Sequence, residues 1–334
     1  MTQRHGLRAG RLWPHEAVMA VEQTDRLSVD AGGKGLLAQL GGVAPVAPDW
    51  FRWALDQAPE RVRLPAAGAT VEGLAWGQRG SQGLLLLHGN GAHADWWSFI
   101  APYFADRYRV VALTWSGMGD SDWRESYDVA LFVAEAMAAS APLGLFDSTA
   151  KPLIAAHSFG GFPAVAMAKI HGARFAGLVS MDSPIDAPGQ EHDGPTPRSK
   201  PNRVYAQFDE ALARFRLAPE QPCENLFAVD HIARRSIKAV EGGYTWKFDP
   251  FIWRKFADQD PAGMLADAAC PVAVMWGEHS ALMPDRVLRH MRSVLGARAP
   301  FVAIPNAAHH LMLDQPLATI AALRALFAAW PAVE

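Results

Sequence analysis

Residues 153–161 read Leu-Ile-Ala-Ala-His-Ser-Phe-Gly-Gly, and this pattern is the strongest indication of the fold class. Its first four residues form a continuous apolar run, which is typical of a strand buried on both faces. Residues 161–171, which follow directly, have the composition of a helix. Ser158 therefore lies on a strand-to-helix turn. The small residues Ala156 and Gly160, two before and two after it, leave room for the strained backbone that such a turn requires.

The same alternation of strand and helix continues on both sides of this stretch. Buried strands are predicted at residues 84–87, 110–113, 178–181, 272–276 and 301–304, and helices at residues 129–141, 285–295 and 317–330. Residues 61–64 and 70–76 predict a strand hairpin ahead of them. Strands that alternate with helices form parallel sheets, so we expect an α/β fold with a mostly parallel central sheet flanked by helices.

The composition changes between residues 184 and 267, where strand patterns give way to helical stretches rich in arginine, glutamate and aromatic residues. We expect a helical cap there, inserted after the sixth strand into a core made of residues 49–183 and 268–334. Residues 1–48 contain two Gly-Gly pairs and two Ala-Pro steps, which predict a loosely packed N-terminal extension. Asp49 then stands where it could cap a short helix.

Charge and composition exclude several classes of partner. The chain has 334 residues, half of them hydrophobic, and its 31 Lys+Arg against 34 Asp+Glu give a formal charge of −3. This balance suits a folded protein that binds a small-molecule substrate, and it gives no basis for nucleic-acid or membrane binding. The absence of a long apolar run favours a cytoplasmic protein, which we expect to be a monomer or homodimer. Cys223 and Cys270 are far apart in the sequence and predict free thiols.

The turn at Ser158 also suggests a chemical role. A serine hydroxyl is a weak nucleophile until a base removes its proton, and histidine is the usual base. His309 and His310 follow the predicted strand at residues 301–304, on a loop at the carboxyl edge of the sheet, where ligands bind in open α/β folds. The alternative is that Ser158 only caps the helix that follows it.

Four motifs in order give the sequence a family resemblance. They lie at residues 87–91 (LHGNG), 117–122 (GMGDSD), 157–161 (HSFGG) and 309–316 (HHLMLDQP). The sequence resembles the α/β-hydrolase superfamily from about residue 61 to its end. In that family the catalytic histidine lies five residues before an acidic residue followed by x-Pro. The resemblance therefore selects His309 as the base, and we expect His310 to pack beside it or to line the pocket.

The position of the acidic partner of the histidine does not follow the most frequent family pattern. The family most often places it three residues after the glycine that ends the seventh strand, where this sequence has Ser280. The remaining candidates are Asp182, directly after the sixth strand, and Glu278. Some relatives with a serine at the usual position use the aspartate after the sixth strand, so we expect Asp182 to be the acid, with Glu278 as the alternative. Asp182 could also simply cap the turn that follows it.

The resemblance also implies an oxyanion hole made of the backbone amides of Asn90 and Phe159. We expect no cofactor, because the Gly-x-Gly at residues 117–119 lacks the third glycine of a dinucleotide-binding motif. We expect no metal site, because the histidines do not follow the spacing of known metal-binding motifs. Asp120 and Asp122 are expected to brace a loop.

Together these features predict a serine hydrolase that acts on a small, hydrophobic carboxylic ester through an acyl-enzyme on Ser158. The same residues would serve a carbon–carbon bond hydrolase, a lactonase or an acyltransferase. A ligand-binding relative that has lost turnover is the alternative from a different class. Family members that act on epoxides or halides carry an aspartate where this sequence has Ser158, which disfavours those activities.

Overall fold

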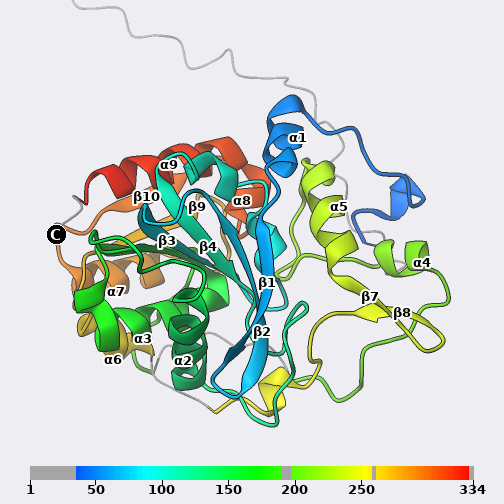
Figure 1. The fold of residues 1–334 in the computed structure, drawn as a ribbon, viewed down its shortest axis with the longest axis horizontal. Helices are drawn as coiled ribbons and strands as arrows, with labels where there is room; N and C mark the ends of the chain where they lie inside the picture. The colour runs from blue at the N-terminus through cyan, green and yellow to red at the C-terminus, as the bar shows by residue number, and fades with distance from the viewer. Residues whose placement is uncertain (1–34, 190–196, 258–260, 331–334) are drawn as a thin grey trace, which may run out of the picture.

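The computed structural model describes residues 35–189, 197–257 and 261–330. Its centre is an eight-stranded sheet (Figure 1) in the order β1-β2-β4-β3-β5-β6-β9-β10. The strands are β1 (Glu60–Ala66), β2 (Ala69–Trp76), β3 (Gln82–Leu87), β4 (Tyr108–Leu113), β5 (Leu153–His157), β6 (Gly177–Met181), β9 (Val272–Gly277) and β10 (Phe301–Ile304). Strand β2 is antiparallel to β1 and β4, and all other neighbours are parallel. The expected hairpin and mostly parallel sheet are confirmed.

Both faces of the central strands are buried, as their apolar runs predict. In β3, Leu84 and Leu86 belong to one hydrophobic cluster, while Leu85 and Leu87 belong to the other. Helices α1 (Asp49–Asp56) and α9 (Pro316–Ala328) cover the first face. Helices α2 (Val129–Ser140), α3 (Gly161–His171), α6 (Pro261–Ala266) and α7 (Asp285–Leu295) cover the second (Figure 1). This layering places the carboxyl ends of the parallel strands at one edge.

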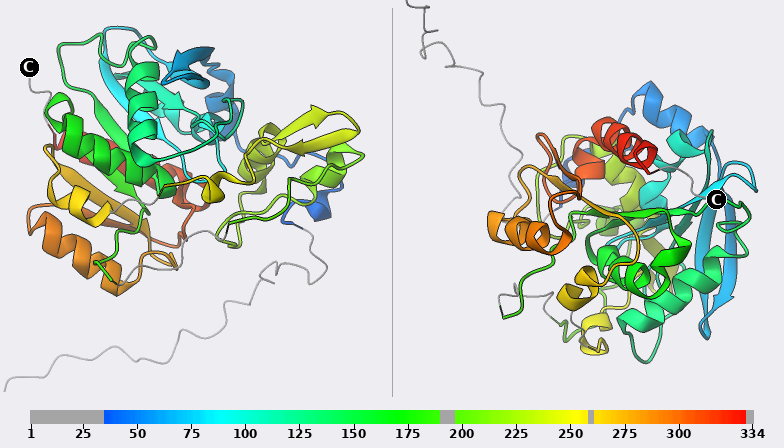
Figure 2. Two further views of the ribbon diagram at one scale, coloured as in Figure 1. Left: turned by 90° about the horizontal axis from the view of Figure 1, so that it is seen from below. Right: turned by 90° about the vertical axis from the view of Figure 1, so that its left-hand side faces the viewer.

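The segment after β6 is only partly helical. It contains α4 (Phe208–Leu212) and α5 (Leu226–Arg235), but also a hairpin of β7 (Ile237–Val240) and β8 (Gly243–Trp246). The hairpin turns at Gly242, which has a φ of 82°, a value that glycine adopts without strain. We call residues 205–246 the cap lobe, and Figure 2 shows it projecting from the sheet. The expectation of a purely helical cap is wrong in this respect.

The core layers resume before the predicted boundary at residue 268. Helix α6 lies within the predicted cap, yet it packs against α3 and α7. Its Leu265 is buried in the core cluster of that face. The apolar face of α6 therefore belongs to the core.

The extension ahead of α1 is packed where it is described. Leu37 is 1% exposed and belongs to a core cluster. The Gly35 amide donates to the Ala213 carbonyl at 2.8 Å, and Arg234 donates to the Gly42 carbonyl at 2.7 Å. Residues 35–42 are thus bound to the cap lobe, and the expectation of loose packing is wrong for them, whereas Val43 and Val46 are exposed. Residues 1–34 lie outside the described part of the chain.

Three smaller expectations have different outcomes. Asp49 is the first residue of α1 and pairs with Arg52, and Pro48 occupies the cap position, so the predicted cap is wrong.

Cys223 and Cys270 are free, the first buried and the second partly buried. Within the described ranges, no helix combines the length and the apolar character needed to cross a membrane.

Candidate active site

Ser158 follows β5 directly and has a φ of 53°. This left-handed backbone is the strain expected of a nucleophile elbow. A Cβ added to Gly160 would lie 2.6 Å from the backbone oxygen of His88, so only glycine fits there. Ala156 is fully buried. These constraints hold the partly exposed Ser158 in a tight turn at the end of the strand.

His309 lies on the loop between β10 and α8 (Leu311–Asp314), which we call the histidine loop, residues 305–310. Its Nε2 is 2.9 Å from Ser158 Oγ, although the two residues are 151 positions apart. His309 is 2% exposed. The ring of His157 holds this loop, because its Nε2 is 2.9 Å from the His309 carbonyl oxygen and must donate to it.

Asp182 follows β6 directly and lies on the other side of the His309 ring. Its Oδ1 is 2.8 Å from His309 Nδ1 and accepts a second hydrogen bond from Ser280 Oγ at 2.6 Å. Its Oδ2 accepts from the Gly277 amide at 2.8 Å. The carboxylate is fully buried and faces three donors. Ser280, at the position where relatives most often carry the acid, binds the aspartate.

Glu278, the alternative acid, lies elsewhere. Its Oε2 accepts from the Asn306 amide at 3.1 Å, and its side chain is 51% exposed. Among the hydrogen bonds of the described residues, none joins Glu278 to His309. The structure therefore brings Asp182, Ser158 and His309 together and leaves Glu278 outside this group.

The loop after β3 is braced against the nucleophile. A Cβ added to Gly89 would lie 3.0 Å from Ser158 Cβ, so this backbone touches the elbow. His88 Nδ1 lies 2.7 Å from the Gly89 carbonyl oxygen and donates to it, while its Nε2 accepts from the Trp115 amide at 3.1 Å. Burial lowers the pKa of His88 to about 3, so the ring is neutral and can play both roles at once.

The two predicted oxyanion donors lie on this loop and on the elbow. Asn90 is exposed and follows Gly89. Phe159 is in the short 3-10 helix Ser158–Gly160. In the first turn of a helix, backbone amides have no partner within the helix, so they can face a ligand. Both amides are therefore carried by backbone that adjoins Ser158.

Asp120 and Asp122 lie on the loop after β4, and Asp122 braces that loop as expected. Asp122 accepts hydrogen bonds from the Thr70 amide at 2.8 Å and from Arg63 at 2.9 Å. These contacts fix the loop to the β1–β2 hairpin. Asp120 instead pairs with Lys247 at 2.6 Å, which links the loop to the segment after the cap lobe.

Sequence reasoning missed a second attachment of the histidine loop, through Gln221 of the cap lobe. Its Oε1 accepts from the His310 amide at 2.9 Å, and its Nε2 donates to both carboxylate oxygens of Asp314 at 2.8 and 2.9 Å. Asp314 also accepts from the Ala308 amide at 2.8 Å, and Asn225 donates to the Asp314 carbonyl at 3.1 Å. No sequence motif marks Gln221, since its contacts depend on tertiary packing.

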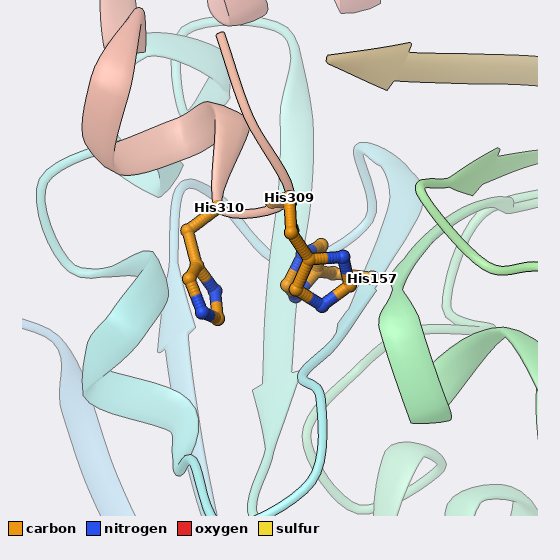
Figure 3. Close-up of side chains that lie close together, drawn as sticks. All are labelled: His157, His309 and His310. Atoms are coloured by element: carbon orange, nitrogen blue, oxygen red, sulfur yellow. Dashed lines mark hydrogen bonds between the residues drawn. The ribbon is translucent and has the colours of Figure 1, made fainter. Parts of the chain in front are cut away.

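Three histidines gather beside the nucleophile (Figure 3): His157, His309 and His310. One ring nitrogen of each lies within 4.8 Å of one nitrogen of each of the others, and all three residues are buried. His309 and His310 extend from the same loop in the same direction, with the His157 ring next to that of His309. The sequence did not predict this group, because His157 comes from a different segment and no motif spacing connects it to the pair.

Aromatic side chains divide between the site and the cap lobe. Phe159 packs against Trp253, with ring centroids 5.4 Å apart, and against Phe256 at 5.9 Å. The other aromatic residues of the segment mostly pack against each other or against the core, among them Tyr205, Phe208, Phe215, Phe227, Tyr244 and Trp246. Trp253 and Phe256 thus place apolar surface next to the residue that follows Ser158.

Comparison with known proteins gives a family match. A family model described as "Alpha/beta hydrolase family" matches residues 84–323. Epoxide hydrolase 3 of Xenopus tropicalis is 25% identical over 281 residues, which cover 76% of this chain and 74% of the relative. The dihydrolipoyllysine-residue acetyltransferase component of the acetoin cleaving system of Pseudomonas putida is 25% identical over 271 residues, covering 77% of this chain and 66% of the relative.

Solved structures share the fold. The thioesterase domain from the curacin biosynthetic pathway superposes with a TM-score of 0.66 at 23% identity, covering 81% of this chain and 99% of the domain. An esterase of Mycobacterium tuberculosis superposes with a TM-score of 0.63 at 19% identity, covering 85% of this chain and 99% of the esterase. At these identities the likeness concerns the fold alone.

Proposed function

Because the chain belongs to the alpha/beta hydrolase family, we propose that it is a serine hydrolase that cleaves a small, hydrophobic carboxylic ester. The observation that carries this proposal is the hydrogen-bonded series Asp182–His309–Ser158, with distances of 2.8 and 2.9 Å. The strained backbone of Ser158 supports it further, since such strain is typical of functional sites.

In the proposed first step, His309 Nε2 takes the proton of Ser158 while Oγ attacks the ester carbonyl carbon. The carbonyl oxygen becomes an oxyanion, which the amides of Asn90 and Phe159 stabilise by about 3 kcal/mol each. Asp182 holds the His309 ring in place and stabilises the imidazolium that forms. The tetrahedral intermediate then collapses, and the leaving alkoxide takes the proton from His309.

In the second step, water attacks the acyl-enzyme. His309 removes a proton from the water, the new oxyanion binds to the same amides, and Ser158 leaves as the alkoxide and recovers its proton. The products are a carboxylic acid and the free enzyme. An alcohol or thiol in place of water would make the reaction an acyl transfer, and the acetyltransferase component among the relatives gives that alternative some support.

The proposed substrate class follows from the surroundings of the nucleophile. Trp253 and Phe256, both partly buried, pack around Phe159 next to Ser158. Pockets lined mainly by apolar and aromatic side chains with few polar groups favour apolar substrates. We therefore propose a small substrate whose acyl group is apolar. Location in the cytoplasm is retained as a further proposal.

The relative named as an epoxide hydrolase suggests a competing activity. In the family, enzymes that open epoxides carry an aspartate at the nucleophile position. Ser158 at this position favours acyl chemistry instead.

A panel of p-nitrophenyl esters with acyl chains of increasing length, together with styrene oxide, tests the proposal. We expect turnover of the esters, none of the epoxide, and covalent labelling of Ser158 by a fluorophosphonate. Ser158→Ala should lose both labelling and turnover, with loss of about 10⁶-fold in kcat. Labelling that persists in Ser158→Ala would show that another residue is the nucleophile and would reject the proposal. A native protein that neither labels nor turns over any ester would also reject it and would favour a ligand-binding relative.

A further inference from the structure

The three histidines beside Ser158 have a geometry that suits a metal ion. Their ring centroids lie 4.8 Å apart for His157 and His309, 4.7 Å for His309 and His310, and 5.6 Å for His157 and His310. In a tetrahedral zinc site, Zn–N bonds of about 2.0–2.1 Å place the ligand nitrogens about 3.4 Å apart. Since the nitrogens here lie within 4.8 Å of one another, the rings have to approach a bound ion by only about an ångström.

The hydrogen bonds of the rings show where a lone pair can be offered. His157 Nε2 donates to the His309 carbonyl, which leaves the lone pair of the His157 ring on Nδ1. His309 Nδ1 faces Asp182, which leaves the lone pair on Nε2. Neutral imidazole is the form that binds Zn²⁺.

His310 provides a second, independent observation. Both of its ring nitrogens are buried without a hydrogen-bond partner of normal geometry, although the Pro219 carbonyl lies nearby. A buried polar atom without a partner is costly and calls for an explanation. A metal ion would satisfy one of these nitrogens, which neither the oxyanion hole nor the Ser158–His309–Asp182 group uses.

The environment also resembles the outer shell of a histidine metal site. Ligating histidines commonly donate their other ring nitrogen to a carboxylate or a backbone carbonyl. His309 has Asp182 in that role at 2.8 Å, and His157 donates to the His309 carbonyl at 2.9 Å. The Asp182 charge would offset part of the charge of the ion.

We propose that His157, His309 and His310 form an inhibitory binding site for a transition-metal ion of the Zn²⁺ class. The ion occupies the lone pair of His309 Nε2 that otherwise accepts the hydrogen bond from Ser158, so it blocks the general base. The binding does not depend on the proposed function, whereas the inhibition rests on it. Hard ions that prefer oxygen ligands, such as Mg²⁺, should not bind.

The binding is tested by titrating Zn²⁺ into the Ser158→Ala protein by calorimetry, with and without His310→Phe. Phenylalanine keeps a ring of similar shape but offers no ligand. We expect one zinc per chain, with affinity at least about tenfold weaker after His310→Phe. His310→Leu serves as a second variant in case the first does not fold. Equal affinity with and without His310 would overturn the site.

The inhibition is tested on the active protein. Zn²⁺ should inhibit ester turnover, and the inhibition constant should rise at least about tenfold in His310→Phe, measured against that variant's own activity. His279→Gln is the matched control, because this exposed histidine lies 3.9 Å from Glu278 and could bind zinc nonspecifically. Inhibition that depends on His279 and not on His310 would refute the proposal. Zinc binding without any ester turnover would leave the site standing and reject only the hydrolase.

Discussion

Asp182 accepts hydrogen bonds from His309, Ser280 and Gly277, so its orientation is fixed. Replacement by asparagine keeps the shape but removes the charge that stabilises the imidazolium, and it can force the wrong histidine tautomer. We expect Asp182→Asn to lower kcat for a p-nitrophenyl ester about 10³- to 10⁴-fold, as loss of the acid does in other triads.

Glu278→Gln is the control for this experiment. Its side chain is half exposed and contacts the Asn306 amide, so kcat should stay within about twofold of the native value. Both variants should keep their melting temperatures near the native one. An Asp182→Asn protein with more than a tenth of the native kcat would show that another group acts as the acid.

Among individual residues, the sequence predicts those that lie in a family motif or directly follow a predicted strand. Ser158, Asp182 and the histidine loop all follow a predicted strand, and parallel strands end at one edge, so their proximity could be inferred. The contacts of Gln221 and of His88 could not be inferred from the sequence. Each depends on a hydrogen bond to a backbone amide that is distant along the chain. In the sequence only the family resemblance favours Asp182 over Glu278, and tertiary geometry is needed to separate them.

Among the elements, the cap lobe is joined to the histidine loop, because Gln221 bridges the His310 amide and the Asp314 carboxylate. Gln221→Ala leaves both groups with one partner fewer and loosens the loop that carries His309. Since small displacements of catalytic groups can cost up to about 100-fold in rate, we expect kcat to fall about 10- to 100-fold with little change in KM. Fluorophosphonate labelling should slow in parallel.

Asn202→Ala provides the matched control for Gln221. The Asn202 amide donates to the Phe248 carbonyl at 2.7 Å, away from the histidine loop. A merely structural role of Gln221 predicts similar losses of stability in both variants and no selective effect on kcat. If kcat falls equally in both, or in neither, the positioning role of Gln221 is wrong.

Substitutions in the segment before α1 measure how much its packing against the cap lobe contributes to the free energy of unfolding. Leu37 is 1% exposed and shares a core cluster with Leu212 and Phe215 of the cap lobe. Leu37→Ala should lower the free energy of unfolding by about 2–5 kcal/mol, measured by urea denaturation. Val46, which is 91% exposed in the same segment, should tolerate alanine within about 0.5 kcal/mol. Equal effects at the two positions would mean that the segment does not pack as described.

The elements themselves were predictable where their pattern was strong and local. The runs in β3, β4 and β5 are apolar throughout because both faces of the sheet are covered. The sequence does not predict the β7–β8 hairpin, although Gly242 lies in its turn, because the surrounding charged residues suggest helix. The packing of residues 35–42 is not predicted for another reason: glycines indicate irregular backbone, and irregular backbone can still be packed against the rest of the protein.

For the whole molecule, buried histidines predict how stability depends on pH. Burial lowers the pKa values of His88 and His231 to about 3 and that of His93 to about 4, against an ordinary value of 6.5. Between these values the unfolded chain binds more protons than the folded one, so the free energy of unfolding falls as pH falls. We expect the melting temperature to decline progressively from about pH 6.5 to about pH 4.

Buried carboxyl groups oppose this decline. Burial raises the pKa values of Glu72, Glu135 and Asp314, so these groups take up protons on folding and oppose the decline near their own pKa values. His231→Gln should flatten the profile, because one buried neutral histidine is removed, whereas His279→Gln at the exposed position should leave it unchanged. A melting temperature that is constant between pH 7 and pH 4 would mean that the buried histidines become protonated without unfolding, and that their surroundings admit charge.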